Sequence, residues 1–437
     1  MKQVALREKT QFNGFVKAAI PFSIALLCAF ASFGVPTSEI NRIADVIRPT
    51  VVAERRDFHM HPELSNRETR TEQVIAEKLR TLGLTEIRTH VAHHGVVALL
   101  QGGKPGPVVA YRADIDALPI NEVHNVPYKS GVSNVMHACG HDAHAAVGLG
   151  VAEVLSQMRA DLPGTIKFIF QPAEEGAPTG EEGGATLMIK EGALENPKPL
   201  AIFGMHTTTE IDAGKVGVRS GPAQAAANMF DLTIRGKMSH AARPENGIDS
   251  IVVASECVTA LQTIKSRRID TFEPVILTIG TIHGGNRRNV ISPEVKMEGT
   301  IRTFTDGALA NIKKQLHQTL KGICDAYGAT YQLNIDEATV PVYNNPSLVT
   351  ETLPALRNAV GTSNVIDAEL RMGAEDFSYF QRVVPGFYWR LGSGNKTKGL
   401  TAEAHTPDFD IDEDCLVVGV KSMANVLWDY LERHGSQ

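Results

Sequence analysis

The 437-residue sequence contains few cysteines and no excess of positive charge. Its five cysteines are odd in number and widely scattered, so they do not form a disulfide framework. The formal net charge of −6 provides no basic surface for nucleic acid or for an anionic membrane. Internal repeats and low-complexity segments are absent, and 43% hydrophobic with 21% charged residues is typical of soluble globular proteins. The length allows about two to four domains.

Only one hydrophobic run is long enough to concern a membrane, and it lies near the N-terminus. It covers residues 18–35, is broken by Pro21 and follows a segment rich in lysine and arginine. Because Ala29-Phe30-Ala31 supplies a small-residue cleavage site, residues 1–31 are expected to be a secretory signal peptide. A retained membrane anchor is the alternative, since the run nearly reaches spanning length. We expect an exported protein, periplasmic or secreted, without stable membrane association after cleavage.

A dense cluster of potential metal ligands lies at residues 136–144. Cys139 and His141 can turn toward one point, because the glycine between them relaxes the backbone. Thiolate and imidazole suit divalent ions such as Zn, Mn, Co and Ni, and one thiolate sulfur can bridge two ions. Taken alone, the cluster fits a histidine-rich helix start with a buried thiol equally well.

Three predicted strands deliver further candidate ligands. Asp114 and Asp116 follow a strand at 107–113, and the Glu174-Glu175 pair follows a buried strand at 165–170. A strand at 200–204 delivers His206. Because open α/β sheets keep their sites at the carboxyl ends of the strands, these groups are expected to meet there with the cysteine cluster. The pattern favours a metal centre at the edge of the sheet.

The order of predicted elements indicates an α/β fold made of two domains. Residues 38–221 begin with a helix at 38–58 and a second helix that Asn66 is expected to cap, and strands and helices then alternate. Residues 222–337 show the order β-α-β-β-α-β of a ferredoxin-like unit. Residues 338–437 return to the mixed pattern. We therefore predict a catalytic domain interrupted by an inserted lid or dimerisation domain.

Ten segments, in order along the chain from about residue 50, resemble the aminoacylase, hippurate-hydrolase and indole-acetyl-amino-acid hydrolase group of metallo-amidohydrolases. The segments are 55–63, 111–119, 136–144, 171–176, 204–206, 239–249, 284–291, 299–304, 373–377 and 405–413. The resemblance implies a two-domain di-metal hydrolase. It also implies hydrolysis of the amide bond of N-acyl amino acids.

Carried over position by position, the resemblance implies a role for ten residues. The ligands of a two-ion site would be Cys139, His141, Glu175, His206 and His405, with Cys139 bridging. Manganese and zinc are the leading metals, and cobalt and nickel are further candidates. Glu174 would be the general base, Asp116 would orient a ligand, and His240 would polarise the scissile carbonyl. The carboxylate of the substrate would be held by Asn289 and Arg302.

Some residues near these motifs receive no catalytic role, and some depart from the family pattern. His137 and His144 flank the cluster but are not expected to be ligands. Glu375 and Asp376 belong near the site, without an assigned task. Serines stand at 250 and 292, where many relatives carry proline, so the geometry of the lid can differ.

Three functions remain open on the sequence. The first is a metal-dependent amidohydrolase that acts on small N-acyl amino acids, with a homodimer through the lid domain as a further expectation. The second is a di-metal dipeptidase or aminopeptidase, which would need a site for a free amino group. The third is a non-catalytic binding protein, against which the presence of Glu174 argues.

Overall fold

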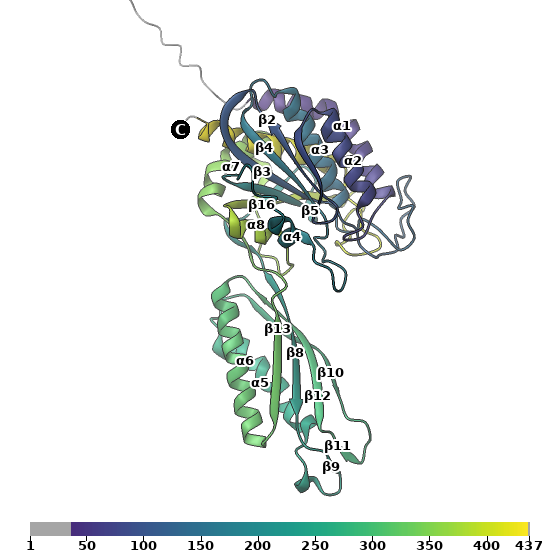
Figure 1. The fold of residues 1–437 in the computed structure, drawn as a ribbon, viewed down its shortest axis with the longest axis vertical. Coiled ribbons are helices and arrows are strands. Elements are labelled where there is room, and N and C mark those ends of the chain that lie inside the picture. Colours follow the sequence, from purple (N-terminus) through teal and green to yellow (C-terminus); the bar gives the residue numbers. More distant parts are fainter. Residues whose placement is uncertain (1–35, 436–437) are drawn as a thin grey trace, which may run out of the picture. The chain divides into compact units, whose positions relative to one another are not determined.

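The computed structural model describes residues 36–435, so the expected signal peptide lies outside the described residues. Over this range no helix combines the length and the hydrophobicity that a membrane span requires. The described chain forms a larger α/β domain and an inserted domain (Figure 1).

The larger domain is built on an eight-stranded sheet in the order β1-β2-β4-β3-β5-β16-β6-β15. The four central strands β4, β3, β5 and β16 run parallel, which brings their carboxyl ends to the same edge. The strands are β1 (Thr85–Val91), β2 (Gly95–Gln101), β3 (Lys104–Asp114), β4 (Pro163–Gln171), β5 (Ile202–Asp212), β6 (Val216–Val218), β15 (Val365–Asp367) and β16 (Gly386–Gly394).

Helices cover both faces of this sheet (Figure 1). On β2, Val96 and Ala98 pack with the helices of one face, while Val97 belongs to the core of the other face, as the period of two in a strand requires. The first face carries α1 (Thr37–Met60), α2 (Thr69–Thr81), α3 (His141–Gln157), α7 (Pro346–Val360) and α9 (Asp414–His434). The second carries α4 (Gly184–Lys190) and α8 (Phe377–Val383).

The start of α2 differs from the prediction. Asn66 does not cap the helix: it has a φ of 60°, and its side chain donates to the carbonyl of Glu182 at 3.0 Å. Glu63 takes the capping role, since its carboxylate accepts the backbone N–H groups of Arg70 at 3.0 Å and Thr71 at 2.8 Å. The prediction failed because a carboxylate from the preceding loop satisfies the free N–H groups.

One strand, β5, is longer than its hydrophobic run suggests. The run at 200–204 predicted a short strand, but β5 continues to Asp212, so His206 lies inside the strand. The extension is stabilised by pairing with β16, in which Gly394 lies opposite Asp212. The pairing partner, and not the local pattern, sets the length of this strand.

The inserted domain has the predicted order of elements. Its four-stranded antiparallel sheet runs β10-β12-β8-β13, and two helices pack on one face. These elements are β8 (Ala226–Arg235), α5 (Ser250–Arg268), β10 (Val275–Gly284), β12 (Glu294–Thr303), α6 (Asp306–Tyr327) and β13 (Thr330–Asp336). A small β9 (Ser239–His240) and β11 (Val290–Ile291) ribbon and a 3-10 turn (Pro244–Asn246) complete it. The α/β fold with a ferredoxin-like insert is therefore confirmed.

The chain leaves and re-enters the larger domain through neighbouring strands. Before the insert lies β7 (Gly221–Gln224), and after it β14 (Val342–Asn344) pairs antiparallel with β7. A short 3-10 turn (Thr362–Asn364) follows α7. The insert has a hydrophobic core of its own that shares no residue with the cores of the larger domain.

Candidate metal centre

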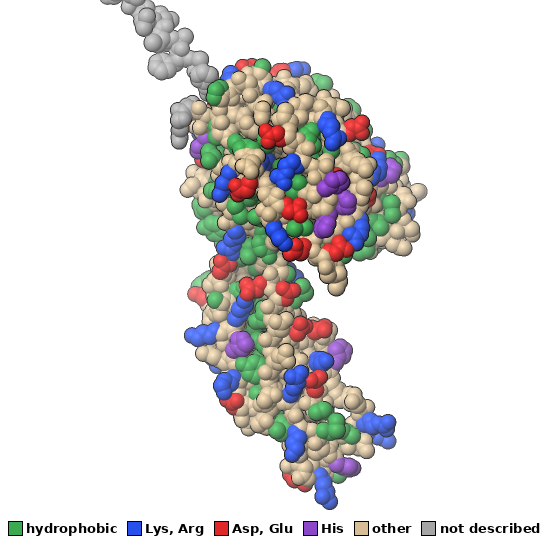
Figure 2. Space-filling view, viewed as in Figure 1, with side chains coloured by type: hydrophobic (Ala, Val, Ile, Leu, Met, Phe, Trp, Pro, Cys, Tyr) green, Lys and Arg blue, Asp and Glu red, His purple; other side chains and the backbone are tan. Residues whose placement is uncertain are grey.

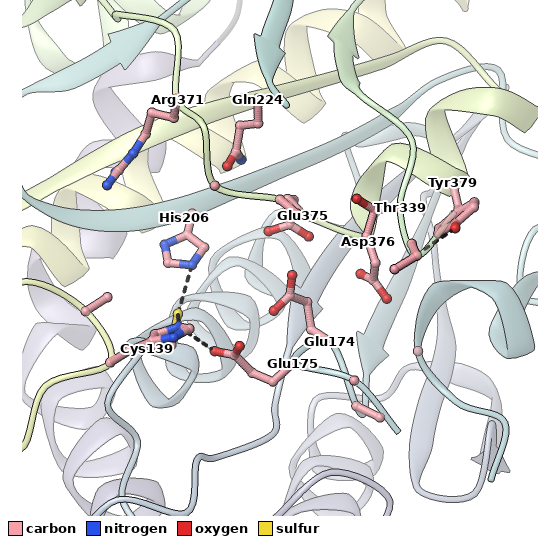
Figure 3. Close-up of a pocket in the computed structure, with 18 of the residues that line it drawn as sticks. Cys139, Glu174, Glu175, His206, Gln224, Thr339, Arg371, Glu375, Asp376 and Tyr379 are labelled. Atoms are coloured by element: carbon pink, nitrogen blue, oxygen red, sulfur yellow. Dashed lines mark hydrogen bonds and ion pairs between the residues drawn. The ribbon is translucent and has the colours of Figure 1, made fainter. Parts of the chain in front are cut away.

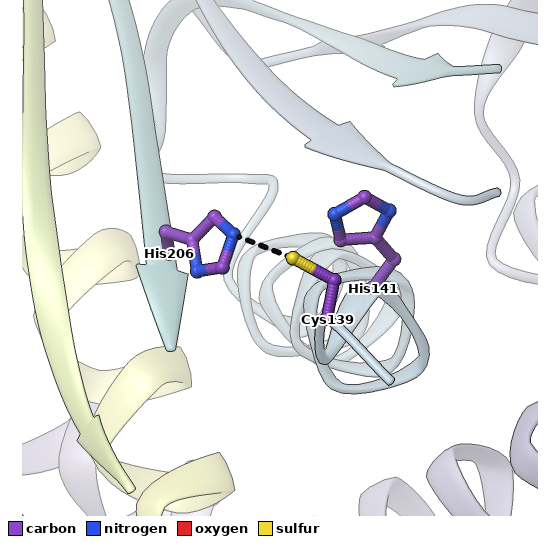
Figure 4. Close-up of side chains that lie close together, drawn as sticks. All are labelled: Cys139, His141 and His206. Carbon is purple, nitrogen blue, oxygen red and sulfur yellow. Dashed lines mark hydrogen bonds between the residues drawn. The ribbon is translucent and has the colours of Figure 1, made fainter. Parts of the chain in front are cut away.

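Cys139 and His141 form the floor of the site, at the start of α3. Gly140 between them has a φ of +93°, a conformation that side chains rarely adopt. A Cβ at this position would lie 2.3 Å from Thr207 Oγ1. Only glycine therefore fits, and the turn places the imidazoles of His141 and His206 on either side of Cys139 Sγ (Figure 4).

Two groups of donor atoms meet at this sulfur. In the first, Cys139 Sγ lies 3.3 Å from His206 Nε2 and near His141. In the second, His405 Nε2 lies 3.3 Å from the same sulfur and 2.9 Å from Glu175 Oε1. The five residues predicted as ligands thus form two overlapping sets with Cys139 in common. This arrangement suits a pair of cations bridged by the thiolate.

The histidine rings are oriented by their second nitrogens. His141 Nδ1 contacts the carbonyl oxygen of Asp116 at 2.9 Å, and its Nε2 is buried without a hydrogen-bond partner among the described residues. His206 Nδ1 lies 2.6 Å from the carbonyl oxygen of Thr207, which leaves Nε2 for the sulfur side. Metal-bound histidines use this pattern, with one N–H donated to an oxygen and the other nitrogen free. The donor set therefore fits divalent ions.

The pKa shifts of His206 and Cys139 bear on how these two residues could bind a cation. Burial lowers the pKa of His206 well below its usual value, so the ring is neutral and keeps its lone pair. Burial, with Glu175 nearby, raises the pKa of the Cys139 thiol to about 12. A cation must displace that proton, which makes metal binding by this cysteine dependent on pH.

Asp116 connects two of the predicted ligands, His141 and Glu175, through its carboxylate. Its Oδ1 lies 3.1 Å from His141 Nδ1, and its Oδ2 accepts the backbone N–H of Glu175 at 3.0 Å and the hydroxyl of Ser65 at 2.8 Å. One buried carboxylate thus orients the helix that carries His141 and the loop that carries Glu175. This geometry supports the orienting role predicted for Asp116.

The Glu174-Glu175 loop is bent, so that the two side chains point in different directions. Ala173 has a φ of 53°, and its N–H donates to Glu68 at 2.9 Å. Glu175 turns toward Cys139, whereas Glu174 points toward Glu375 (Figure 3). Glu174 Oε2 lies 3.8 Å from His141 Nε2. Burial, together with Glu375 and Glu175, raises the pKa of Glu174 well above its usual value.

Glu375 and Asp376, to which the sequence assigns no task, both pair with a buried arginine. The guanidinium of Arg112 lies 2.8 Å from Asp376 and 3.0 Å from Glu375, and it also pairs with Asp114. Gln171 donates to both carboxylate oxygens of Asp376 at 2.8 Å. Burial raises the pKa of Asp376 to about 7. Arg112 thus offsets part of the negative charge of three carboxylates behind the site, and sequence reasoning assigned it no role.

The two flanking histidines differ in their surroundings: His144 is hydrogen-bonded through both nitrogens, whereas both nitrogens of His137 are buried without a hydrogen-bond partner among the described residues. His144 Nδ1 contacts Asp114, and its Nε2 accepts the N–H of Thr207 at 2.9 Å, so both nitrogens are engaged. His137 packs near His59, and burial lowers its pKa to about 4. Asp114, His141 and His144 lie close enough together to form a further potential ligand group, so the exclusion of these two histidines stays a prediction.

A cavity of about 820 Å³ opens over the centre and is lined by four of the five predicted ligands, all but His141, by Glu174 and by residues of both domains. Arg302 of β12 lines it, as does Arg371, which bonds Glu210 at 2.9 Å and Thr208 at 3.2 Å. Sequence reasoning missed Arg371, although it lies two residues before the Gly373–Phe377 motif. Gln224, Thr339 and Tyr379 also line the cavity (Figure 3) and carry no sequence signal.

His240 and Asn289 are brought together, but away from this cavity. The backbone N–H of Ala241 donates to the carbonyl of Asn289 at 3.1 Å, and His240 pairs with Val290 across the β9–β11 ribbon. Both side chains are exposed and neither lines the cavity. The ribbon lies at the end of the insert opposite its two chain connections (Figure 1). Their roles in the reaction stay predictions.

Comparison with known proteins finds relatives that match most of this chain. The family model described as Peptidase family M20/M25/M40 matches residues 110–429. The IAA-amino acid hydrolase ILR1-like 2 of Arabidopsis thaliana is 38% identical over 391 residues, covering 88% of this chain and 85% of the relative. Thermostable carboxypeptidase 2 of Saccharolobus solfataricus is 37% identical over 380 residues, covering 86% of this chain and 94% of the relative.

A solved structure agrees with these relatives. The YXEP protein of Bacillus subtilis, described as a dinuclear metal-binding peptidase from the M20 family, has a TM-score of 0.77 and 35% identity. It covers 89% of this chain and 99% of its own. The predictions of an amidohydrolase-type enzyme and of a hydrolase of C–N bonds are confirmed. The match over residues 110–429 and the long, similar relatives place the chain in the Peptidase family M20/M25/M40.

Proposed function

We propose that the protein hydrolyses the amide bond of N-acyl amino acids, with two divalent ions held by Cys139, His141, Glu175, His206 and His405. The observation that carries this proposal is the pair of donor sets that share Cys139 Sγ beside the half-buried carboxylate of Glu174. Manganese or zinc is the proposed metal, because cysteine, histidine and glutamate together suit first-row divalent ions.

The proposed reaction uses Glu174 as the proton carrier. Two divalent ions, when bound, lower the pKa of a water molecule and polarise a carbonyl. The raised pKa of Glu174 makes its carboxylate a good acceptor for the proton of the attacking water. Glu174 then returns that proton to the leaving nitrogen, which would otherwise depart as an unstable anion. Its bent loop and its contact with His141 hold it beside the site.

The cavity supports a substrate with a carboxylate. Arg302 and Arg371 both line it, and a guanidinium binds a carboxylate through two parallel hydrogen bonds. The name of the plant relative, an IAA-amino acid hydrolase, fits this substrate class. The name of the archaeal relative, a carboxypeptidase, keeps peptides as a second candidate. Both classes end in a free carboxylate, so one site can serve either.

The test is hydrolysis by Glu174→Gln. Metal-stripped protein is reloaded with Mn, Zn, Co or Ni and given hippurate, N-acetyl amino acids, indole-acetyl amino acids and dipeptides. The amide variant keeps the shape of the loop but cannot accept a proton, so kcat should fall by roughly 10² to 10⁴ while metal content stays unchanged. Glu182→Gln, which alters an exposed carboxylate paired with Lys190, is the matched control and should keep full activity.

The outcomes separate the candidates. Cleavage of acyl amino acids that is lost only in Glu174→Gln supports the proposal. Cleavage of dipeptides alone would replace it with the peptidase function. No turnover with any metal, despite tight metal binding, would leave a binding protein.

We further propose a homodimer through the inserted domain and export of the mature chain. In the described chain β10 pairs only with β12, so its other edge is open, and Ile282 on it is 51% exposed. A second copy could also bring the His240 and Asn289 ribbon to the cavity. Sedimentation of the purified protein tests the dimer, and cell fractionation with N-terminal sequencing tests cleavage after Ala31.

A further inference from the structure

A second group of potential metal ligands lies on the surface of the larger domain, away from the centre at Cys139. It consists of Glu72 on α2 and of His90 and His94 at the turn between β1 and β2. One donor atom from each residue lies within 4.8 Å of the other two. The group shares no residue with either donor set at Cys139.

The turn directs both imidazoles toward one carboxylate. His90 Nδ1 lies 3.0 Å from Glu72 Oε1, and His94 Nδ1 lies 3.0 Å from Glu72 Oε2. Positive φ angles of 58° at His90, 51° at Ala92 and 74° at His93 reverse the chain so that residues 90 and 94 face α2 together. The N–H of Ala92 donates to Glu191 Oε2 at 2.7 Å, which anchors the turn independently of the histidines.

The carboxylate of Glu72, which lies between the two histidines, is buried. Its side chain is only 2% exposed, yet its ion-pair partners in the described chain are the two histidines, with no lysine or arginine among them. A buried carboxylate is expensive unless a cation or a metal compensates its charge. The nearby Glu191 adds further negative charge, while the side chain of His90 is 75% exposed and leaves an entry from solvent.

We propose that Glu72, His90 and His94 bind a divalent cation of the zinc type, as a third metal site that is structural and not catalytic. Zinc bonds of about 2.0–2.1 Å to nitrogen and oxygen place tetrahedral ligands roughly 3.3 Å apart. Each histidine lies 3.0 Å from one oxygen of Glu72, close to that value, and the donor atoms of the three residues lie within 4.8 Å of one another, so the two imidazoles must close in on a shared ion. Two histidines and one carboxylate leave the fourth position for water.

The proposed ion would lock the β1–β2 turn onto the first turn of α2. That end of α2 also carries Glu68, which holds Ala173 and so supports the Glu174-Glu175 loop. Figure 2 shows histidine side chains gathered on one face of the larger domain. Loss of the ion should therefore lower stability and leave the chemistry at Cys139 intact.

Zinc counting on the full chain tests the site. Metal-stripped protein is titrated with zinc, desalted, and its zinc per chain is measured by mass spectrometry. His90→Ala with His94→Ala should lose one zinc per chain, while hydrolysis stays unchanged. His93→Ala is the matched control, because His93 belongs to the same turn but contacts the carbonyl of Glu182 at 3.1 Å. It should keep the full zinc content. Glu72 is left unchanged, since it also accepts the N–H of His90.

A second variant distinguishes loss of the zinc site from a folding defect. With Cys139→Ala and His141→Ala the catalytic centre is removed, and one zinc per chain should remain that raises the melting temperature. Adding the two turn substitutions to this protein should abolish both the zinc and the shift. Equal zinc content in wild type and the His90, His94 variant would overturn the proposal and leave a pair of histidine–carboxylate hydrogen bonds. An equal loss of zinc in His93→Ala would also overturn the proposal.

Discussion

Gly140 lies where the backbone must turn sharply between two predicted metal ligands. Its φ of +93° costs any other residue about 1 kcal/mol or more in backbone strain, and a Cβ would meet Thr207 Oγ1 at 2.3 Å. Thr207 follows His206, a predicted ligand, and donates its N–H to His144. A side chain at 140 would therefore displace ligands on α3 and on β5 together.

Gly140→Ala should weaken metal binding by about tenfold or more, since displaced ligands and their supporting contacts typically cost that much. Gly214→Ala is the control: Gly214 has a similar φ of +96°, but a Cβ there meets nothing within 4 Å. Metal affinity is measured by calorimetric titration of the stripped proteins. Both variants share the backbone strain, so equal affinities in the two would contradict the steric argument.

At the scale of the element, the start of α2 supports the loop that carries Glu174 and Glu175. Glu68 precedes the helix and accepts the N–H of Ala173, which keeps that residue in its left-handed conformation. Burial raises the pKa of Glu68 from 4.5 to about 8, with Asp116 adding to the shift. The carboxyl group is thus protonated at neutral pH in the folded chain and ionised in the unfolded chain.

This difference predicts how stability changes with pH. Between pH 4.5 and 8 the folded chain binds the extra proton, so the contribution of Glu68 to stability is present below pH 4.5 and is lost as the pH rises through 8. Glu68→Gln should remove that loss and be more stable than wild type at pH 8 by on the order of 2–4 kcal/mol. Urea unfolding of metal-stripped protein from pH 5 to 9 measures it.

Glu181→Gln provides the control for that profile. Its carboxylate bonds Arg67, which lowers its pKa to about 2, so it does not titrate over the range studied. This variant should follow the wild-type profile in shape. Parallel profiles for wild type and Glu68→Gln would contradict the assignment.

At the scale of the whole molecule, the chain contains hydrophobic cores that belong to separate domains. The core of the insert lies entirely within residues 230–329, and those of the larger domain lie outside that range. The chain passes between the domains only twice, beside the β7–β14 pair. Every predicted metal ligand belongs to the larger domain.

Calorimetry should therefore resolve two unfolding transitions, of which added metal raises only one. Ligand at 100 times its dissociation constant stabilises its domain by about 2.7 kcal/mol. The protein with Cys139→Ala and His141→Ala serves as the control, in which the shift from the catalytic ions should disappear. A single transition that metal moves as a whole would show that the two domains unfold together.

Much of the candidate site could be predicted because its signals are local. Cys139 and His141 are two residues apart around a glycine, and Asp114 and Asp116 alternate along one strand end. The cap at Asn66 failed because Asn66 bonds the carbonyl of Glu182, 116 residues away, which leaves Glu63 to cap α2. Arg112 carried no local signal, because its partners Glu375 and Asp376 follow it by more than 260 residues.

The sequence alone determined the α/β alternation, the β-α-β-β-α-β insert and the residue types of the metal centre, since each depends on short-range periodicity or on a compact motif. Only the tertiary structure decided that His405 reaches Cys139 across 266 residues, and that Glu175 faces the sulfur while Glu174 faces Glu375. It also decided that His240 and Asn289 lie together outside the cavity. The physical reason is that strand pairing and packing set these distances, and no local pattern of side chains encodes them.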